Sequence, residues 1–131
     1  MRLLLDTHCW LWMQTTPERF SPASLALLED PATELLFSAA SSWEIIIKWS
    51  VGKLSLPMKP REYVLSRMER QATYGLPIHH RHALRVGSLP LHHRDPFDRI
   101  LLAQAVCEHL PLLTADRRLA AYDNVELLWA A

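Results

Sequence analysis

The sequence lacks the features that mark several special classes of protein. It has no excess of either charge: basic and acidic residues both number 14 among 131 residues, so the net charge is zero with histidine neutral. This balance gives no support to nucleic-acid binding through overall charge, although it leaves room for a local basic patch. The only cysteines, Cys9 and Cys107, are too few for a disulfide framework. We expect reduced, buried thiols in a cytoplasmic protein.

Long apolar runs and repeats are also missing. Residues 1–5 carry one arginine and a short apolar run, which is too brief for a signal peptide or a membrane span. We therefore expect neither, and we find no internal repeat and no low-complexity segment. Half of the residues are hydrophobic, which is enough for a substantial core. No linker divides the chain, so residues 1–131 are expected to form a single domain.

Short apolar runs alternate with helical patterns along the chain. The predicted strands cover residues 3–5, 35–39, 112–114 and 125–129, with a short edge strand at 76–78 because Pro77 could not serve in a central one. The predicted helices cover residues 7–13, 22–28, 41–51, 60–71, 82–86, 96–106 and 117–122. This alternation predicts an α/β fold with a parallel central sheet that helices flank on both faces.

Acidic residues fall at corresponding places on this scaffold. Asp6 and Asp116 each follow a predicted strand, whereas Glu44 and Asp98 lie in the first turns of predicted helices. In an open parallel sheet these are all positions at the carboxyl end, where ligand crevices form. Carboxylates crowded together raise one another's pKa, and a divalent cation would neutralise them. All-oxygen ligands favour Mg²⁺ or Mn²⁺ over zinc.

Each acid also has an explanation as a helix cap. Ser41-x-x-Glu44 matches a capping box, and Asp6 and Asp116 each precede a predicted helix. Asp95 suits the N-cap before Pro96, and Asp98 then lies near the positive end of the helix dipole. If the acids were only helix caps, this coincidence would have to occur four times at the same edge of the sheet. We therefore favour a shared site.

The sequence resembles the PIN-domain ribonucleases, and within them the bacterial toxins of the VapC type. The resemblance rests on four blocks in the same order: Leu4-Leu5-Asp6-Thr7-His8, Ser42-Trp43-Glu44-Ile45, Arg94-Asp95-Pro96-Phe97-Asp98-Arg99 and Thr114-Ala115-Asp116. It implies a metal-binding and catalytic quartet of Asp6, Glu44, Asp98 and Asp116. It also implies supporting roles for Thr7, Asp95, Arg99 and Thr114. Asp95 and Asp98 could exchange the roles of cap and ligand.

The resemblance further implies an activity and partners. The activity is endonucleolytic cleavage of RNA that depends on Mg²⁺ or Mn²⁺ and leaves 5′-phosphate and 3′-hydroxyl ends. The protein would be the toxin of a type II toxin–antitoxin pair, neutralised by a small antitoxin that inserts a segment into the crevice. A homodimer in the cytoplasm, with no membrane association, is expected.

Basic residues flank the acids and could bind RNA phosphates, or could simply be solvated; they are Lys48, Lys53, Arg94, Arg99, Arg117 and Arg118.

Two other functions are compatible with part of the pattern. A non-catalytic PIN-like binding module would not need the quartet. A Mg²⁺-binding receiver domain needs a late lysine, and the chain has none after Lys59.

Overall fold

The computed structural model describes residues 1–131 and is built on a five-stranded sheet in the order β3-β2-β1-β4-β5. Its strands are β1 (Arg2–Leu5), β2 (Glu34–Ser38), β3 (Thr73–Leu76), β4 (Leu112–Thr114) and β5 (Leu127–Trp129). Every pair of neighbouring strands is parallel. The predicted α/β fold with a parallel central sheet is therefore confirmed.

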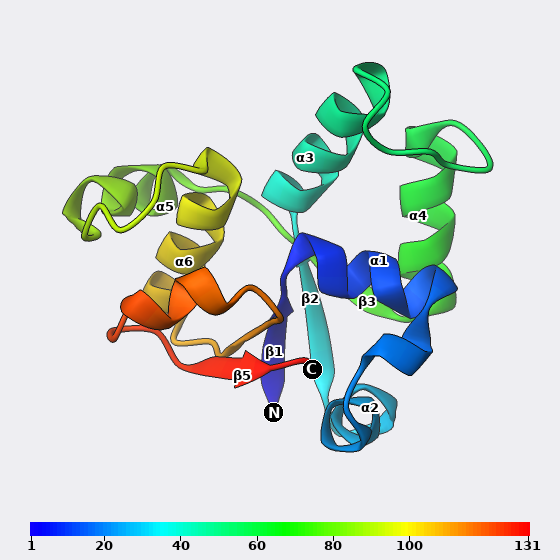
Figure 1. Ribbon diagram of the computed structural model, residues 1–131, viewed down its shortest axis with the longest axis horizontal. Helices are drawn as coiled ribbons and strands as arrows, with labels where there is room; N and C mark the ends of the chain where they lie inside the picture. The colour runs from blue at the N-terminus through cyan, green and yellow to red at the C-terminus, as the bar shows by residue number, and fades with distance from the viewer.

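The helices cover both faces of the sheet, as predicted. They are α1 (Thr7–Thr15), α2 (Pro22–Glu29), α3 (Ala39–Ser50), α4 (Pro60–Arg70), α5 (His80–Arg85) and α6 (Pro96–Glu108), with short 3-10 segments η1 (Pro17–Arg19), η2 (Val86–Ser88) and η3 (Arg117–Ala121). Figure 1 shows α5 and α6 on the left of β1 and β2, and α1, α3 and α4 on the right.

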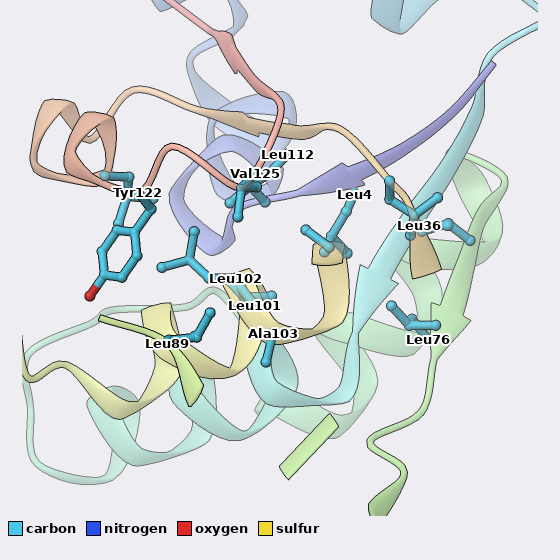
Figure 2. Packing of buried hydrophobic residues seen from close by; sticks show 13 residues of the cluster. Leu4, Leu36, Leu76, Leu89, Leu101, Leu102, Ala103, Leu112, Tyr122 and Val125 are labelled. Atoms are coloured by element: carbon cyan, nitrogen blue, oxygen red, sulfur yellow. The ribbon is translucent and has the colours of Figure 1, made fainter. Parts of the chain in front are cut away.

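Two apolar clusters, one on each face, hold the helices to the sheet. Leu3, Leu4 and Leu5 of β1 are completely buried, as expected for a parallel strand covered on both sides. Because side chains alternate along a strand, Leu4 belongs to one cluster, whereas Leu3 and Leu5 belong to the other. Figure 2 shows the first cluster, in which residues of α6 pack beneath Leu4.

The start of α3 differs from the prediction. The helix begins at Ala39 rather than at residue 41, because Ser38 at the end of β2 caps it: the Ser38 hydroxyl oxygen accepts from the Ala40 N–H at 3.0 Å. Ser41 therefore lies inside the first turn, where its hydroxyl accepts from the Thr7 hydroxyl at 2.8 Å. The capping-box interpretation of Ser41 and Glu44 is wrong, and one explanation that competed with a site role for Glu44 disappears.

The third strand also lies elsewhere than predicted. It covers Thr73–Leu76 instead of residues 76–78, and it pairs with β2 so that Leu36 lies opposite Tyr74. Pro77, which lacks an N–H to donate, directly follows the strand. The strand does lie at the edge of the sheet, as expected from its proline.

The apolar face of α3 is only partly used for packing. Ile45 is buried in the core, whereas Trp43, Ile46 and Val51 are exposed by 53%, 45% and 62%. The apolar residues of this helix therefore also form a face that does not face the core. Of the two thiols, Cys9 is buried and Cys107 is half-buried, and both are free. No helix is long and apolar enough to cross a membrane.

Candidate metal centre

The predicted acids meet where the strand order reverses. The chain passes from β1 to β2 on one side, and β4 pairs with β1 on the other. Open parallel sheets form their ligand crevices at the carboxyl end of such a switch. A pocket of about 290 Å³ lies here, and its charged lining residues are Asp6, His8, Glu44, Lys48, Lys53, Asp95, Asp98, Asp116 and Arg118. All four predicted acids and Asp95 therefore line one pocket.

Asp6 is the most buried of the acids that line this pocket, with only 2% of its surface exposed. It follows β1 and caps α1: Oδ1 accepts from the Thr7 N–H at 2.8 Å, and Oδ2 accepts from the Thr114 hydroxyl at 2.6 Å. Burial raises the pKa of Asp6, and the positive charge that His8 can carry is the largest influence in the opposite direction. The donors on both oxygens hold the carboxylate in one orientation.

Thr114 joins two of the acids. Its hydroxyl donates to Asp6 and accepts from the Asp116 N–H at 3.0 Å, so one fully buried side chain sets the spacing between the ends of β1 and β4. Asp116 itself caps η3 by accepting from the Arg118 N–H at 3.1 Å. The cap that the sequence suggested for Asp116 is therefore present, in addition to its place in the pocket.

Replacing Thr114 by valine should destabilise the fold. Valine has nearly the same shape but can neither donate to Asp6 nor accept from Asp116, so two buried polar groups lose their partner. We expect the free energy of unfolding to fall by about 1–3 kcal/mol, measured by urea denaturation. Thr114→Ser keeps the hydroxyl and should lose less; equal losses in both variants would contradict a role for the hydroxyl.

Glu44 reaches the pocket from the second turn of α3. Its side chain is almost entirely buried, yet Oε2 accepts from the Lys48 ammonium at 2.6 Å, one helical turn further on. The hydrogen bond to Glu44 is the main reason that the pKa of Lys48 is raised. Glu44 is therefore ion-paired with a lysine whose side chain is half exposed.

Asp95 takes the capping role that the sequence favoured for it. Asp95 caps α6: its Oδ1 accepts from the N–H groups of Phe97 at 2.9 Å and Asp98 at 3.2 Å. Asp98 takes no part in capping, and its Oδ2 lies 3.2 Å from His93 Nε2 and 3.8 Å from Arg118 Nη2. The geometry makes Asp98 the better candidate ligand of the two.

The electrostatics of Asp98 are strongly perturbed. Its pKa is raised from 3.8 to about 7, and burial is the largest cause. The further causes are the negative charges of its neighbours, in the order Asp6, Asp95, Glu44 and Asp116. By contrast, the hydrogen bonds from Arg118 lower the pKa of Asp116. Carboxylates with divergent pKa values in one cleft are typical of a functional site.

Arg99 is placed differently from the other predicted supporting residues. It is buried, and its guanidinium donates to the carbonyls of Val86 and Pro90 and to the Tyr122 hydroxyl. It does not line the pocket, so it is not positioned to bind a phosphate there. Its contribution to the site is indirect, since Tyr122 also contacts His93 at 3.2 Å.

Two histidines that contact the acids were not among the predicted site residues. His8 Nε2 accepts from the Ala115 N–H at 3.0 Å, so a proton on Nδ1 faces Asp6 Oδ2 at 3.6 Å. His93 bridges Asp98 and Tyr122. Burial lowers the pKa of His93. No local pattern marks either residue, because one partner of each comes from a distant part of the chain: Ala115 for His8 and Tyr122 for His93.

The donor set fits a hard divalent cation. It consists of carboxylate oxygens without cysteine, which suits Mg²⁺ or Mn²⁺ rather than zinc. In the structure, however, no three acidic, histidine or cysteine side chains are arranged to bind one ion together. Glu44 is paired with Lys48, and Asp116 with Arg118. A cation would therefore have to exchange with these basic partners.

Comparison with known proteins gives two curated relatives. The ribonuclease VapC22 of Mycobacterium tuberculosis is 30% identical over 123 residues, which are 93% of this chain and 92% of the relative. The ribonuclease VapC16 of the same organism is 42% identical over 57 residues. That second match spans 44% of this chain and only 40% of the length of VapC16, so it is a partial one.

The fold recurs in solved structures. A chain in the crystal structure of VapBC2 from Rickettsia felis, bound to a DNA fragment from their promoter, superposes with a TM-score of 0.75. The match covers 100% of both chains at 14% identity, and at that identity it concerns the fold alone. The sequence profile of the PIN domain matches residues 3–125. The resemblance found in the sequence is thus confirmed, and the chain belongs to the PIN domain family.

Proposed function

We propose that this protein, a single domain over residues 1–131, is a metal-dependent endoribonuclease that acts as the toxin of a toxin–antitoxin pair. The observation that carries the proposal is the meeting of Asp6, Glu44, Asp98 and Asp116 in one pocket at the switch point of a PIN sheet. A relative that matches almost the whole chain is named a ribonuclease, which supports RNA as the substrate. Acting on RNA, the protein would work in the cytoplasm.

The residues of the pocket have distinct tasks in this proposal. Asp6, Glu44, Asp98 and Asp116 would hold Mg²⁺ or Mn²⁺, which when bound activates water and stabilises charge on the scissile phosphate. Thr114 fixes the orientation of Asp6 and the distance to Asp116. Thr7 ties the start of α1 to α3 through Ser41. Asp95 fixes the start of α6, which presents Asp98.

One experiment tests the activity. The purified protein is incubated with total cellular RNA in the presence of Mn²⁺, of Mg²⁺ or of a chelator, and the cleavage ends are mapped. We expect cleavage with either ion and none with the chelator, with 5′-phosphate at the new ends. Binding of RNA without cleavage under all three conditions would favour the non-catalytic module instead. Full cleavage in the chelator would refute the metal dependence.

The proposed partner is a small antitoxin, and the exposed apolar surface supports it. Ile46, Val64 and Leu65 help to line a groove of about 280 Å³ between α3 and α4. Further apolar side chains of α3 are exposed to solvent as well. Surfaces of this kind mark sites where another chain binds. The fold shared with a chain of a VapBC complex is consistent with such a partner.

We further expect the protein to form a homodimer when no antitoxin is present. The reason is the exposed apolar side chains of α3, which include Trp43 and Trp49 at 53% and 40% exposure. Aromatic residues are enriched at the centres of protein interfaces. Multi-angle light scattering should give twice the monomer mass at micromolar concentration. A monomer at all concentrations would contradict this prediction.

A further inference from the structure

Two basic side chains, from α3 and η3, form ion pairs with acids of the pocket. Arg118, in η3, contacts Asp116 through Nε at 3.0 Å and Nη2 at 2.6 Å, and Nη2 also lies 3.8 Å from Asp98 Oδ2. Lys48, in α3, contacts Glu44 at 2.6 Å. Three of the four acids thus lie within ion-pair distance of a lysine or an arginine of the same chain.

Both basic side chains can leave without disturbing the core. The side chains of Arg118 and Lys48 are 66% and 49% exposed, whereas the acids they contact are largely buried. Because the basic members of these pairs are solvated, they can move into water at little cost, and a divalent cation in their place would compensate the charge of the carboxylates. A buried pair would instead resist exchange, because removing one member leaves an uncompensated charge.

From this arrangement we infer that Arg118, assisted by Lys48, is an internal counter-ion that competes with the divalent cation for the carboxylates. When the cation displaces Arg118, its guanidinium binds the RNA phosphate. This inference rests on the proposed function for its second step only. The guanidinium suits both steps, because its planar fork matches carboxylate and phosphate oxygens equally well. Held at the rim of the pocket, it would meet the backbone of an RNA entering there.

A purely local explanation exists for the Arg118–Asp116 pair. The two residues are two positions apart, and Asp116 also caps the Arg118 backbone, so the turn alone brings their side chains together. On that explanation the ion pair would stabilise the turn and would have no influence on metal binding. The additional approach of Nη2 to Asp98, which comes from another element, is what the turn does not account for.

Arg117 provides a matched control. It is adjacent in the sequence and carries the same charge, but its guanidinium donates to the Ala131 carbonyl at 2.8 Å and stacks 4.1 Å from the Trp129 ring. It does not line the pocket. A change that follows from lost net charge alone would appear equally in Arg117→Gln and Arg118→Gln.

The first measurement is calorimetric titration of the metal-free protein with MnCl₂, with no RNA present. We expect Arg118→Gln to bind Mn²⁺ about two- to fivefold more tightly than wild type, because an ion pair of this strength no longer competes. Lys48→Gln should shift the affinity in the same direction. Arg118→Lys, which keeps the charge, should stay near wild type. Unchanged or weaker binding by both glutamine variants would overturn the inference.

The second measurement is steady-state RNA cleavage at saturating Mn²⁺. The released guanidinium should contact substrate, so Arg118→Gln should raise KM several-fold and leave kcat nearly unchanged, whereas Arg117→Gln should change neither. An unchanged KM in Arg118→Gln would refute the phosphate contact while leaving the competition established by calorimetry. If wild type cleaves no RNA, the proposed function fails, and the Mn²⁺ titration still decides whether Arg118 competes with the cation.

Discussion

Replacing Asp6 by asparagine should abolish RNA cleavage while leaving the protein folded. Asparagine keeps an oxygen that can accept from the Thr7 N–H, so the cap of α1 survives. Its amide nitrogen cannot accept from the Thr114 hydroxyl or bind a cation, and one ligand charge is lost. Changing a residue that only orients a metal ligand costs about 10–100-fold, so loss of a ligand itself should reduce the cleavage rate by at least about a hundredfold.

The measurement compares initial cleavage rates at saturating Mn²⁺, with circular dichroism to confirm that the variant is folded. Asp30→Asn is the matched control. Asp30 is also a carboxylate that accepts from a backbone N–H, that of Ala32 at 2.9 Å, but it lies in the connection before β2 and does not line the pocket. Its substitution should leave the rate unchanged. Undiminished cleavage by Asp6→Asn would show that this carboxylate is not needed for the chemistry.

The position of the candidate site could be predicted from the sequence, because few folds are compatible with its alternation of apolar strands and helices. Strands that are apolar throughout must be buried on both faces, and their alternation with helices makes the sheet parallel. Once the sheet is parallel, Asp6 and Asp116 have to lie at the same edge as the starts of α3 and α6. Neither step depends on the precise ends of any element. The error in the predicted start of α3 therefore did not affect the prediction that these acids lie at one edge of the sheet.

The contacts within the site could not be predicted in the same way. The Thr114 hydroxyl reaches Asp6 across 108 positions, and the Ala115 N–H reaches His8 across 107, so no local pattern encodes either bond. The same holds for the contact of His93 with Tyr122. Periodicity also fails to show which face of a helix is buried when a second apolar face exists, as it does on α3.

The start of α3 shows how one residue can serve two elements. Ser38 is the last residue of β2, and its hydroxyl caps the next helix. A sequence pattern that looks for a cap outside the strand therefore starts the helix too late and assigns Ser41 to the wrong role. The position of β3 in the sequence was predicted wrongly for a related reason. Thr73-Tyr74-Gly75 is not an apolar run, and it joins the sheet because it pairs with β2.

Asp98→Asn should separate a metal ligand from a helix cap, and its effect on stability should depend on pH. In wild type the folded protein holds the Asp98 proton up to a pKa of about 7, whereas the unfolded chain releases it near 3.8. The stability that this proton contributes is complete below pH 3.8 and is lost as the pH rises to about 7. Asparagine does not titrate, so it avoids this loss.

With a chelator present, we therefore expect the variant to exceed wild type in stability by less at pH 5 than at pH 8, because only part of this loss has occurred at pH 5. At pH 8 the variant should be more stable by about 1–4 kcal/mol, since each unit of pKa shift corresponds to about 1.4 kcal/mol. Urea denaturation at both pH values measures the difference. If Asp98 only stabilised the helix dipole, the variant would instead be less stable by about 0.3–1 kcal/mol at pH 8.

Addition of Mn²⁺ should reverse the order of stability of wild type and Asp98→Asn. Wild type gains stability by mass action, about 2.7 kcal/mol when the ion is at a hundred times its dissociation constant, because the ion binds the folded site alone. Asp98→Asn should lose most of this gain. Asp95→Asn, which keeps the oxygen that caps α6, should retain most of it. If Mn²⁺ stabilises wild type and Asp98→Asn equally while Asp95→Asn loses the gain, then Asp95 is the ligand and Asp98 only a neighbouring acid whose charge the site disfavours.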